Sequence, residues 1–254
     1  MKQIPNLFTL LNLVFGCVAI VFILQTGEKI VVLQQNVLIP LGLPEKIAWG
    51  SFFIFWAAVI DFLDGFVARL FKSTSSMGKQ LDSLADVVSF GVAPGLILYQ
   101  LLRISYAQEE NGLDVSIGWL LPAFLVPCAA AWRLAKFNLD EGQQYSFRGL
   151  PTPAAGLLIA SFPLIIWFES FGMQEYLQNK WILYVIIFLV SYLMVSKLSL
   201  MSLKFSDFGW RNNMPKYLLA VISAIAIIIL QWLAMPVILL AYVLISLLFK
   251  SKSA

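Results

Sequence analysis

Apolar runs of membrane-spanning length follow one another along almost the whole chain, and they constrain its fold more than any other feature. Of the 254 residues, 60% are hydrophobic and only 12% are charged. An ordinary soluble domain has roughly 45–50% apolar and about 25% charged residues. A soluble fold of this size could not bury so much apolar surface. The composition therefore excludes a water-soluble enzyme and predicts an all-α protein that is integral to a membrane.

The apolar runs divide into about eight candidate transmembrane helices. Each such helix needs about 20 apolar residues, so eight of them leave only short loops. We therefore predict one membrane-embedded domain over residues 1–254, with an external or re-entrant loop at 26–45. The region after about residue 181 carries no motif beyond its apolar helices, and the last two spans are close enough to form one hairpin. The candidate spans are residues 7–25, 46–70, 79–103, 117–138, 150–171, 181–196, 215–233 and 235–249.

The basic residues predict the orientation of the chain. If both termini are cytoplasmic, 13 of the 17 Lys and Arg residues lie on the inner side, and only Lys29, Lys46, Arg103 and Lys180 lie outside. Cytoplasmic loops of membrane proteins carry this excess of positive charge, and an odd number of spans would spoil it. We expect a multi-pass protein of the inner (cytoplasmic) cell membrane.

The remaining composition excludes further classes of function. The chain has no histidine, which removes histidine-based acid–base catalysis and histidine-ligated zinc or haem. Its net charge of +3 is small, and no basic, aromatic-interleaved patch of the kind that nucleic acid requires is visible. We therefore expect no nucleic-acid partner.

Four aspartates lie in or beside the apolar helices: Asp61, Asp64, Asp82 and Asp86. Carboxylates at membrane depth are costly and are almost always paired, hydrated or functional. The first two are three residues apart and the last two are four apart, so each pair shares one face of its helix. Two helices joined by a short loop can aim all four into one pocket. Hard divalent cations such as Mg²⁺ or Mn²⁺ are the natural counter-charge, although an ion path through a transporter also uses such carboxylates.

Small and basic residues beside the aspartates favour the metal interpretation. Gly65 and Gly78 cost helix stability unless a ligand such as a diphosphate or a nucleobase must approach the backbone closely. Arg69 lies one turn beyond Gly65, where it can meet phosphate oxygens. Residues 61–86 thus read Asp61-x-x-Asp64-Gly65-x-x-Ala68-Arg69-x(8)-Gly78-x-x-x-Asp82-x-x-x-Asp86.

This string resembles, at every defined position, the signature of the CDP-alcohol phosphatidyltransferases. The resemblance implies that fold, and two divalent cations, Mg²⁺ or Mn²⁺, held by the four aspartates beneath a CDP diphosphate. It also implies that Asp86 is the base that deprotonates the acceptor alcohol. Contacts to the CDP-lipid are implied for Gly65, Arg69, Ser75 and Gly78 of the signature, and for Asn6 and Thr9 of an Asn-x-x-Thr stretch in the first helix.

Four blocks within roughly the first 155 residues resemble the bacterial phosphatidylserine synthases of the membrane-integral type: residues 4–12, 83–95, 131–138 and 147–155. That branch implies CDP-diacylglycerol as donor, L-serine as acceptor, products phosphatidylserine and CMP, and a homodimer with its active site on the cytoplasmic side. A serine carboxylate needs a fixed cation, for which the candidates are Arg133, Lys136 and Arg148. Lys136 stands where the resemblance leads us to expect arginine, and it lacks the bidentate geometry of that residue.

Two alternatives remain open at this point. The same chemistry could use glycerol 3-phosphate or an inositol phosphate as acceptor, because the signature fixes only the donor. A cation-coupled transporter could use the aspartates as its ion site. Transporters usually contain internal repeats, and none is visible in this sequence.

Overall fold

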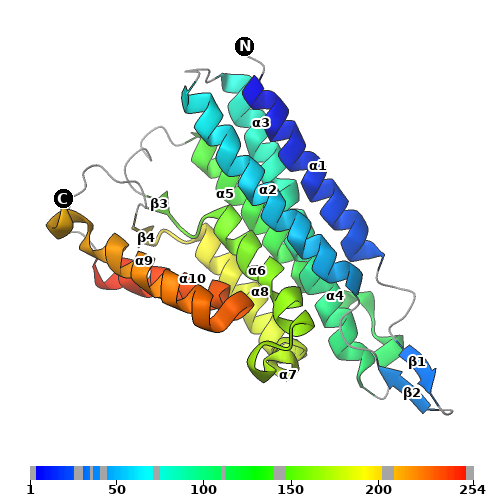
Figure 1. Cartoon of the computed structure of the whole chain (residues 1–254). Coiled ribbons are helices and arrows are strands. Elements are labelled where there is room, and N and C mark those ends of the chain that lie inside the picture. The colour runs from blue at the N-terminus through cyan, green and yellow to red at the C-terminus, as the bar shows by residue number, and fades with distance from the viewer. Residues whose placement is uncertain are drawn as a thin grey trace.

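The computed structural model describes residues 4–25, 31–34, 37–40, 45–70, 75–109, 112–139, 147–201 and 209–249. Long helices make up most of these residues, and they lie side by side in an elongated bundle (Figure 1). The predicted helical fold is therefore confirmed. In chain order, the helices are α1 (Ile4–Leu24), α2 (Glu45–Leu70), α3 (Ser76–Val87), α4 (Ala93–Ala107), α5 (Leu125–Leu139), α6 (Thr152–Trp167), α7 (Gln174–Leu177), α8 (Lys180–Val195), α9 (Trp210–Leu230) and α10 (Ala234–Leu248).

Two short antiparallel ribbons accompany the helices. Strand β1 (Val31–Gln34) pairs with β2 (Val37–Pro40) within the segment that we predicted to be an external or re-entrant loop. Strand β3 (Phe147–Arg148) pairs with β4 (Ser199–Leu200), which joins the chain before α6 to the chain after α8. The second ribbon links segments about fifty residues apart, and no local sequence pattern predicts such a pairing.

Four stretches of the described residues are long and apolar enough to cross a membrane. They are Pro5–Leu24, Lys46–Val67, Ser76–Ala107 and Asn213–Leu248, while Thr152–Trp167 and Lys180–Val195 are apolar but shorter. Each of the eight predicted spans overlaps a helix of the structure. That all eight cross the bilayer stays a prediction.

The structure differs from the predicted spans at the start of the fourth, and it agrees with the two separate spans predicted at the end of the chain. The fourth span was predicted to begin at residue 117, but 3₁₀ turns occupy 117–119 and 121–124 and the α-helix starts at Leu125. Pro122 has no backbone N–H and favours the first turn of a helix. The last two predicted spans are two helices that form a hairpin, as their close spacing in the sequence allowed, and Gln231, with a φ of 50°, ends the first of them. Helices α9 and α10 then pack against each other (Figure 1).

A π-helical turn at Val88–Val92 joins α3 to α4 and lies at the centre of the core. The N–H of Ala93 bonds to the oxygen of Val88, one residue further back than in an α-helix. Two glycines bring other helices against this turn. A Cβ on Gly16 of α1 would lie 2.3 Å from the Ser89 hydroxyl, and one on Gly156 of α6 would lie 2.9 Å from the Cα of Phe90. Small residues permit such close helix contacts in membranes, and here they fix α3 relative to α1 and α6.

Candidate metal and substrate site

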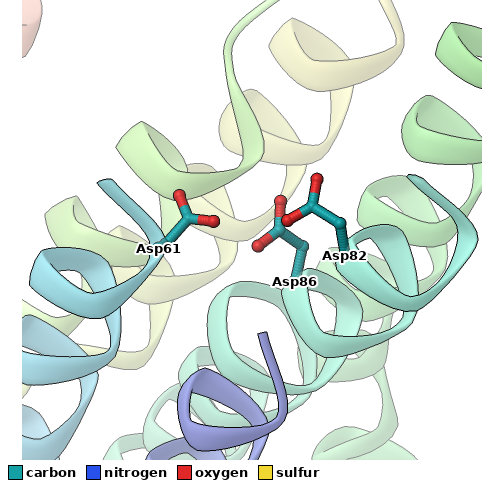
Figure 2. A group of neighbouring side chains, drawn as sticks. All are labelled: Asp61, Asp82 and Asp86. Atoms are coloured by element: carbon teal, nitrogen blue, oxygen red, sulfur yellow. The ribbon is translucent and has the colours of Figure 1, made fainter. Parts of the chain in front are cut away.

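Three aspartate side chains from two helices meet near the end of the bundle where α1 begins. Asp61 extends from α2, whereas Asp82 and Asp86 extend from α3, and all three are directed towards the same space (Figure 2). One carboxylate oxygen of each lies within 4.8 Å of the others. The predicted convergence of the two helices is therefore present for these three residues.

Asp64 lines the same cavity but points its carboxylate at α1. The Thr9 hydroxyl donates a hydrogen bond to Oδ2 of Asp64, and both side chains are buried. The same hydroxyl lies 3.2 Å from the main-chain oxygen of Pro5, so the first turns of α1 fix its position. The structure thus places Asp64 next to the group of three, with Thr9 as its partner.

Asn12 is a polar contact to the aspartates to which the sequence analysis assigned no role. Its Nδ2 lies 3.4 Å from Oδ1 of Asp86 and donates to it, and its side chain is fully buried. The Ser89 hydroxyl donates to the main-chain oxygen of Asn12 at 3.1 Å, which ties this turn of α1 to the π-helical turn. The available signal was periodicity, because Asn6, Thr9 and Asn12 recur every three residues and share one face of α1.

A cavity of about 660 Å³ lies over the aspartates. Its lining includes all four aspartates, together with five of the six residues predicted to contact the CDP-lipid: Asn6, Thr9, Gly65, Ser75 and Gly78. The sixth is Arg69, which belongs to the last turn of α2. Its side chain is not among those that the structure describes. Three helices therefore bring residues that are up to 80 positions apart to the wall of one cavity.

The start of α3 has little free space. Ser75 caps the helix, since its Oγ accepts a hydrogen bond from the N–H of Gly78 at 2.9 Å. A Cβ on Gly78 would lie 3.0 Å from that oxygen and 3.1 Å from Oδ1 of Asn6. A glycine at this position lets α1 and the cap of α3 meet at the edge of the cavity.

Arg133 on α5 is a basic residue whose charge interacts with that of an aspartate of the site. It lies near enough to Asp86 for their charges to interact, and its Nη1 donates to Oγ1 of Thr152 at 3.0 Å. Its Nε is buried and has no hydrogen-bond partner within the described part of the chain. This leaves one donor of the guanidinium for another group.

Of the other two predicted acceptor-binding residues, Lys136 is found beside Arg133 and Arg148 is described by its backbone alone. Lys136 shares with Arg133 a small cavity of about 20 Å³, which the end of α8 closes through Met194, Val195 and Ser196. Arg148 lies in β3, paired with Ser199, and its side chain is not described. The structure therefore brings Arg133 and Lys136 together.

Lys79 is a further basic residue of the main cavity that the sequence analysis treated only as an inner-side charge. It lines the cavity with the aspartates. Its Nζ donates to the main-chain oxygen of Asn138 at 3.4 Å and lies 5.8 Å from the centre of the Phe137 ring. Its position one turn before Asp82 was the available signal.

The residues of the site fit a hard divalent cation. Asp61, Asp82 and Asp86 offer only oxygen ligands, which Mg²⁺ and Mn²⁺ prefer, and their oxygens are close enough to share an ion. Among the lysine and arginine side chains that the structure describes, none forms an ion pair with these aspartates, whereas Lys180 pairs with Glu109 elsewhere in the fold. A bound cation would supply the missing counter-charge.

Several known proteins are similar to this chain over most of its length. The family model described as CDP-alcohol phosphatidyltransferase matches residues 2–193. A CDP-diacylglycerol–serine O-phosphatidyltransferase from Bacillus subtilis is 30% identical over 185 residues, which are 71% of this chain and 89% of that protein. A protein of the same name from Helicobacter pylori J99 is 44% identical over 103 residues, which are 40% of each chain. Another, from Mycobacterium tuberculosis H37Rv, is 29% identical over 253 residues, which are 95% of this chain and 76% of that protein.

Proposed function

The chain belongs to the CDP-alcohol phosphatidyltransferase family, and on that premise we propose that it transfers the phosphatidyl group of CDP-diacylglycerol to the hydroxyl of L-serine. The products are phosphatidylserine and CMP. The observation that carries the proposal is the group of three carboxylates, Asp61, Asp82 and Asp86, in the wall of a cavity large enough for a nucleotide diphosphate. The names of the relatives support serine as the acceptor.

Asp61, Asp64, Asp82 and Asp86 would hold two divalent cations. When bound, such cations would stabilise the charge that develops on the attacking and leaving oxygens of phosphoryl transfer. The hydrogen bond from Thr9 keeps Asp64 turned towards α1, and Asn12 holds one oxygen of Asp86.

The chain's own residues account for the steps of the transfer. Asn6, Gly65, Ser75 and Gly78 border the space for the CDP group. Asp86 takes the proton of the serine hydroxyl, and the serine oxygen attacks the phosphorus that carries the diacylglycerol. The bond from that phosphorus to the CMP oxygen breaks, and CMP leaves with the electron pair. Positioning and charge stabilisation supply most of the rate gain in reactions of this kind.

Arg133 is placed to receive the carboxylate of serine. Its charge interacts with that of Asp86, and its buried Nε has no hydrogen-bond partner among the described residues. A carboxylate bound there would set its hydroxyl towards the base. Lys136, in the same small cavity, and Arg148 are the other candidates for this contact.

The proposal includes the setting of the enzyme. The chain is a multi-pass membrane protein, and we place its active site and both termini on the cytoplasmic side of the inner membrane, following the distribution of basic residues. A homodimer is proposed from the family resemblance alone. The acyl chains of the donor would extend from the cavity into the bilayer.

An acceptor panel tests the proposed reaction. Purified protein receives CDP-diacylglycerol, a divalent metal and one alcohol at a time: serine, glycerol 3-phosphate or an inositol phosphate. We expect CMP release with serine at a kcat/KM far above that with the other alcohols. If another alcohol outcompetes serine, the acceptor assignment is wrong while the metal chemistry is retained.

A further inference from the structure

Two buried hydroxyl groups stand out in the apolar helix α10. Tyr242 and Ser246 lie four residues apart, so they share one face of the helix, and they are only 7% and 3% exposed. On the opposite side, Leu240, Leu244 and Leu248 are at least 58% exposed. A face that packs against the protein would normally carry apolar side chains, so these two hydroxyl groups require an explanation.

Both hydroxyl groups bind the backbone of the same residue. The Tyr242 hydroxyl donates to the main-chain oxygen of Met201 at 2.9 Å, and the Ser246 Oγ accepts from the N–H of Met201 at 3.1 Å. Helix α10 thus satisfies both main-chain groups of one residue, as a neighbouring strand would. In a membrane protein, unsatisfied main-chain groups are particularly costly, so the two contacts fix Met201 firmly.

Met201 directly follows β4, the strand that pairs with β3 and its residue Arg148. In the ribbon, Ser199 pairs with Arg148 and Leu200 pairs with Phe147. The N–H of Gly149 bonds to the oxygen of Leu198 at 2.8 Å and continues the pairing towards α6. Fixing Met201 therefore fixes the ribbon that carries one of the candidate acceptor-binding arginines.

The phenol of Tyr242 also lies in the neighbourhood of Arg133 on α5, whose Nη1 atom donates to Thr152. The link from α10 to the candidate arginines runs through Met201 and the β3–β4 ribbon to Arg148. The connection comes from a helix beyond residues 2–193, which the family model matches.

We propose that Tyr242 and Ser246 are positioning residues that hold the acceptor side of the active site in place. The C-terminal helices α9 and α10 are then part of the acceptor site and not only a membrane anchor. This inference rests on the proposed function, since it assigns the arginines to binding of the acceptor carboxylate. It predicts that α10 affects the use of serine and leaves the use of CDP-diacylglycerol unchanged.

Steady-state kinetics of the full chain test the proposal. The variants are Tyr242→Phe, Ser246→Ala and the double substitution, each measured with serine and CDP-diacylglycerol varied in turn. Because each hydrogen bond contributes modestly, we expect each single variant to raise the KM for serine about fivefold and the double variant more than tenfold. The KM for CDP-diacylglycerol and kcat should stay within about twofold. Tyr192→Phe, which removes the same group from a tyrosine of α8 that is 68% exposed, is the matched control and should change none of the three constants.

Hydrogen exchange supplies a second measurement that does not depend on turnover. The amide of Met201 should exchange faster in Ser246→Ala than in the wild-type protein, and at the wild-type rate in Tyr192→Phe. The single variants give this result even if the double variant does not fold. An unchanged KM for serine in folded variants, or a loss of kcat without a change in that KM, overturns the inference. A wild-type protein that releases no CMP with serine instead overturns the proposed function, and the two failures are therefore distinguishable.

Discussion

At Thr9 the structure adds a partner that the sequence could not supply. The residue was predicted to contact the CDP-lipid, and its hydroxyl group is bonded to Asp64. A hydroxyl that donates to a metal-binding carboxylate fixes the orientation of that ligand. Its expected contribution to substrate binding would therefore act through Asp64.

Substituting Thr9 should weaken metal binding. Loss of a hydrogen bond to a ligating carboxylate typically costs about 10–100-fold in metal affinity or activity. We expect Thr9→Val to need about 10–100-fold more Mn²⁺ or Mg²⁺ for half-maximal activity, as measured by metal titration of CMP release. Thr9→Ser keeps the hydroxyl and should titrate like the wild-type protein. Equal metal requirements for valine and serine at this position would contradict this role.

Arg133 provides a residue-scale test of the acceptor side. Loss of one partner of a buried charged contact costs on the order of 2–5 kcal/mol, so Arg133→Ala should raise the KM for serine at least about 30-fold. The KM for CDP-diacylglycerol should change little. Lys136→Ala is the comparison within the same small cavity. A larger effect on the CDP-diacylglycerol KM than on the serine KM would remove Arg133 from the acceptor site.

Among single residues, the sequence predicts which side chains gather at the cavity better than it predicts their hydrogen-bond partners. Asp61, Asp82 and Asp86 could be identified because carboxylates are rare in apolar helices and their spacing places them on shared faces. The bond from Thr9 to Asp64 and that from Asn12 to Asp86 depend on how α1 packs beside α2 and α3. Such partners result from tertiary packing, which helical periodicity does not specify.

At the scale of elements, the π-helical turn is the feature that orients α3. It begins at Val88, two residues beyond Asp86, and π-helical turns are often found at functional sites. The turn is enclosed by α1 at Gly16 and by α6 at Gly156. Any displacement of this turn would move Asp86 relative to Asp61 on α2.

Enlarging a glycine at the π-helical turn should destabilise the fold. In Gly156→Ala the new Cβ would lie 2.9 Å from the Cα of Phe90, which is too close for backbone atoms to accommodate without a shift. Overpacking of this kind typically costs about 1–3 kcal/mol, so the apparent melting temperature in detergent should fall. Gly118→Ala, whose Cβ would lie 3.6 Å from the Ser116 hydroxyl, is the matched control and should melt like the wild-type protein. Equal melting temperatures of the two variants would contradict the close packing described for Gly156.

The elements were predictable where hydrophobicity alone determines them. Helices α1, α2 and α8 begin and end within a few residues of the predicted spans, since an apolar run bounded by charges or turns is enough to define them. The break between the last two helices was predicted near residue 234, and the structure places it at Gln231. The ribbon between β3 and β4 was not predicted, because it depends on contacts between distant segments.

For the whole molecule, the basic residues predict the side of the membrane that the cavity faces. Ser75 lies exposed at the cap of α3 beside that cavity. After the native Cys17 and Cys128 are replaced, a cysteine at position 75 should react with a membrane-impermeant thiol reagent only in inside-out vesicles. A cysteine at position 29, predicted to lie outside, should show the opposite pattern. Labelling of position 75 in intact cells would reverse the orientation.

Removal and return of the metal test the central claim most directly. Incorporation of isotope-labelled serine into lipid is measured on the purified protein with CDP-diacylglycerol. We compare the protein as purified, after excess chelator, and after Mg²⁺ or Mn²⁺ is restored, for the wild-type chain and for Asp82→Asn. We expect labelled phosphatidylserine to disappear with the chelator and to return with the metal in the wild-type protein, while folded Asp82→Asn stays inactive throughout. Full turnover in excess chelator, or normal turnover by Asp82→Asn, would contradict a metal-dependent phosphatidyl transfer at Asp61, Asp82 and Asp86.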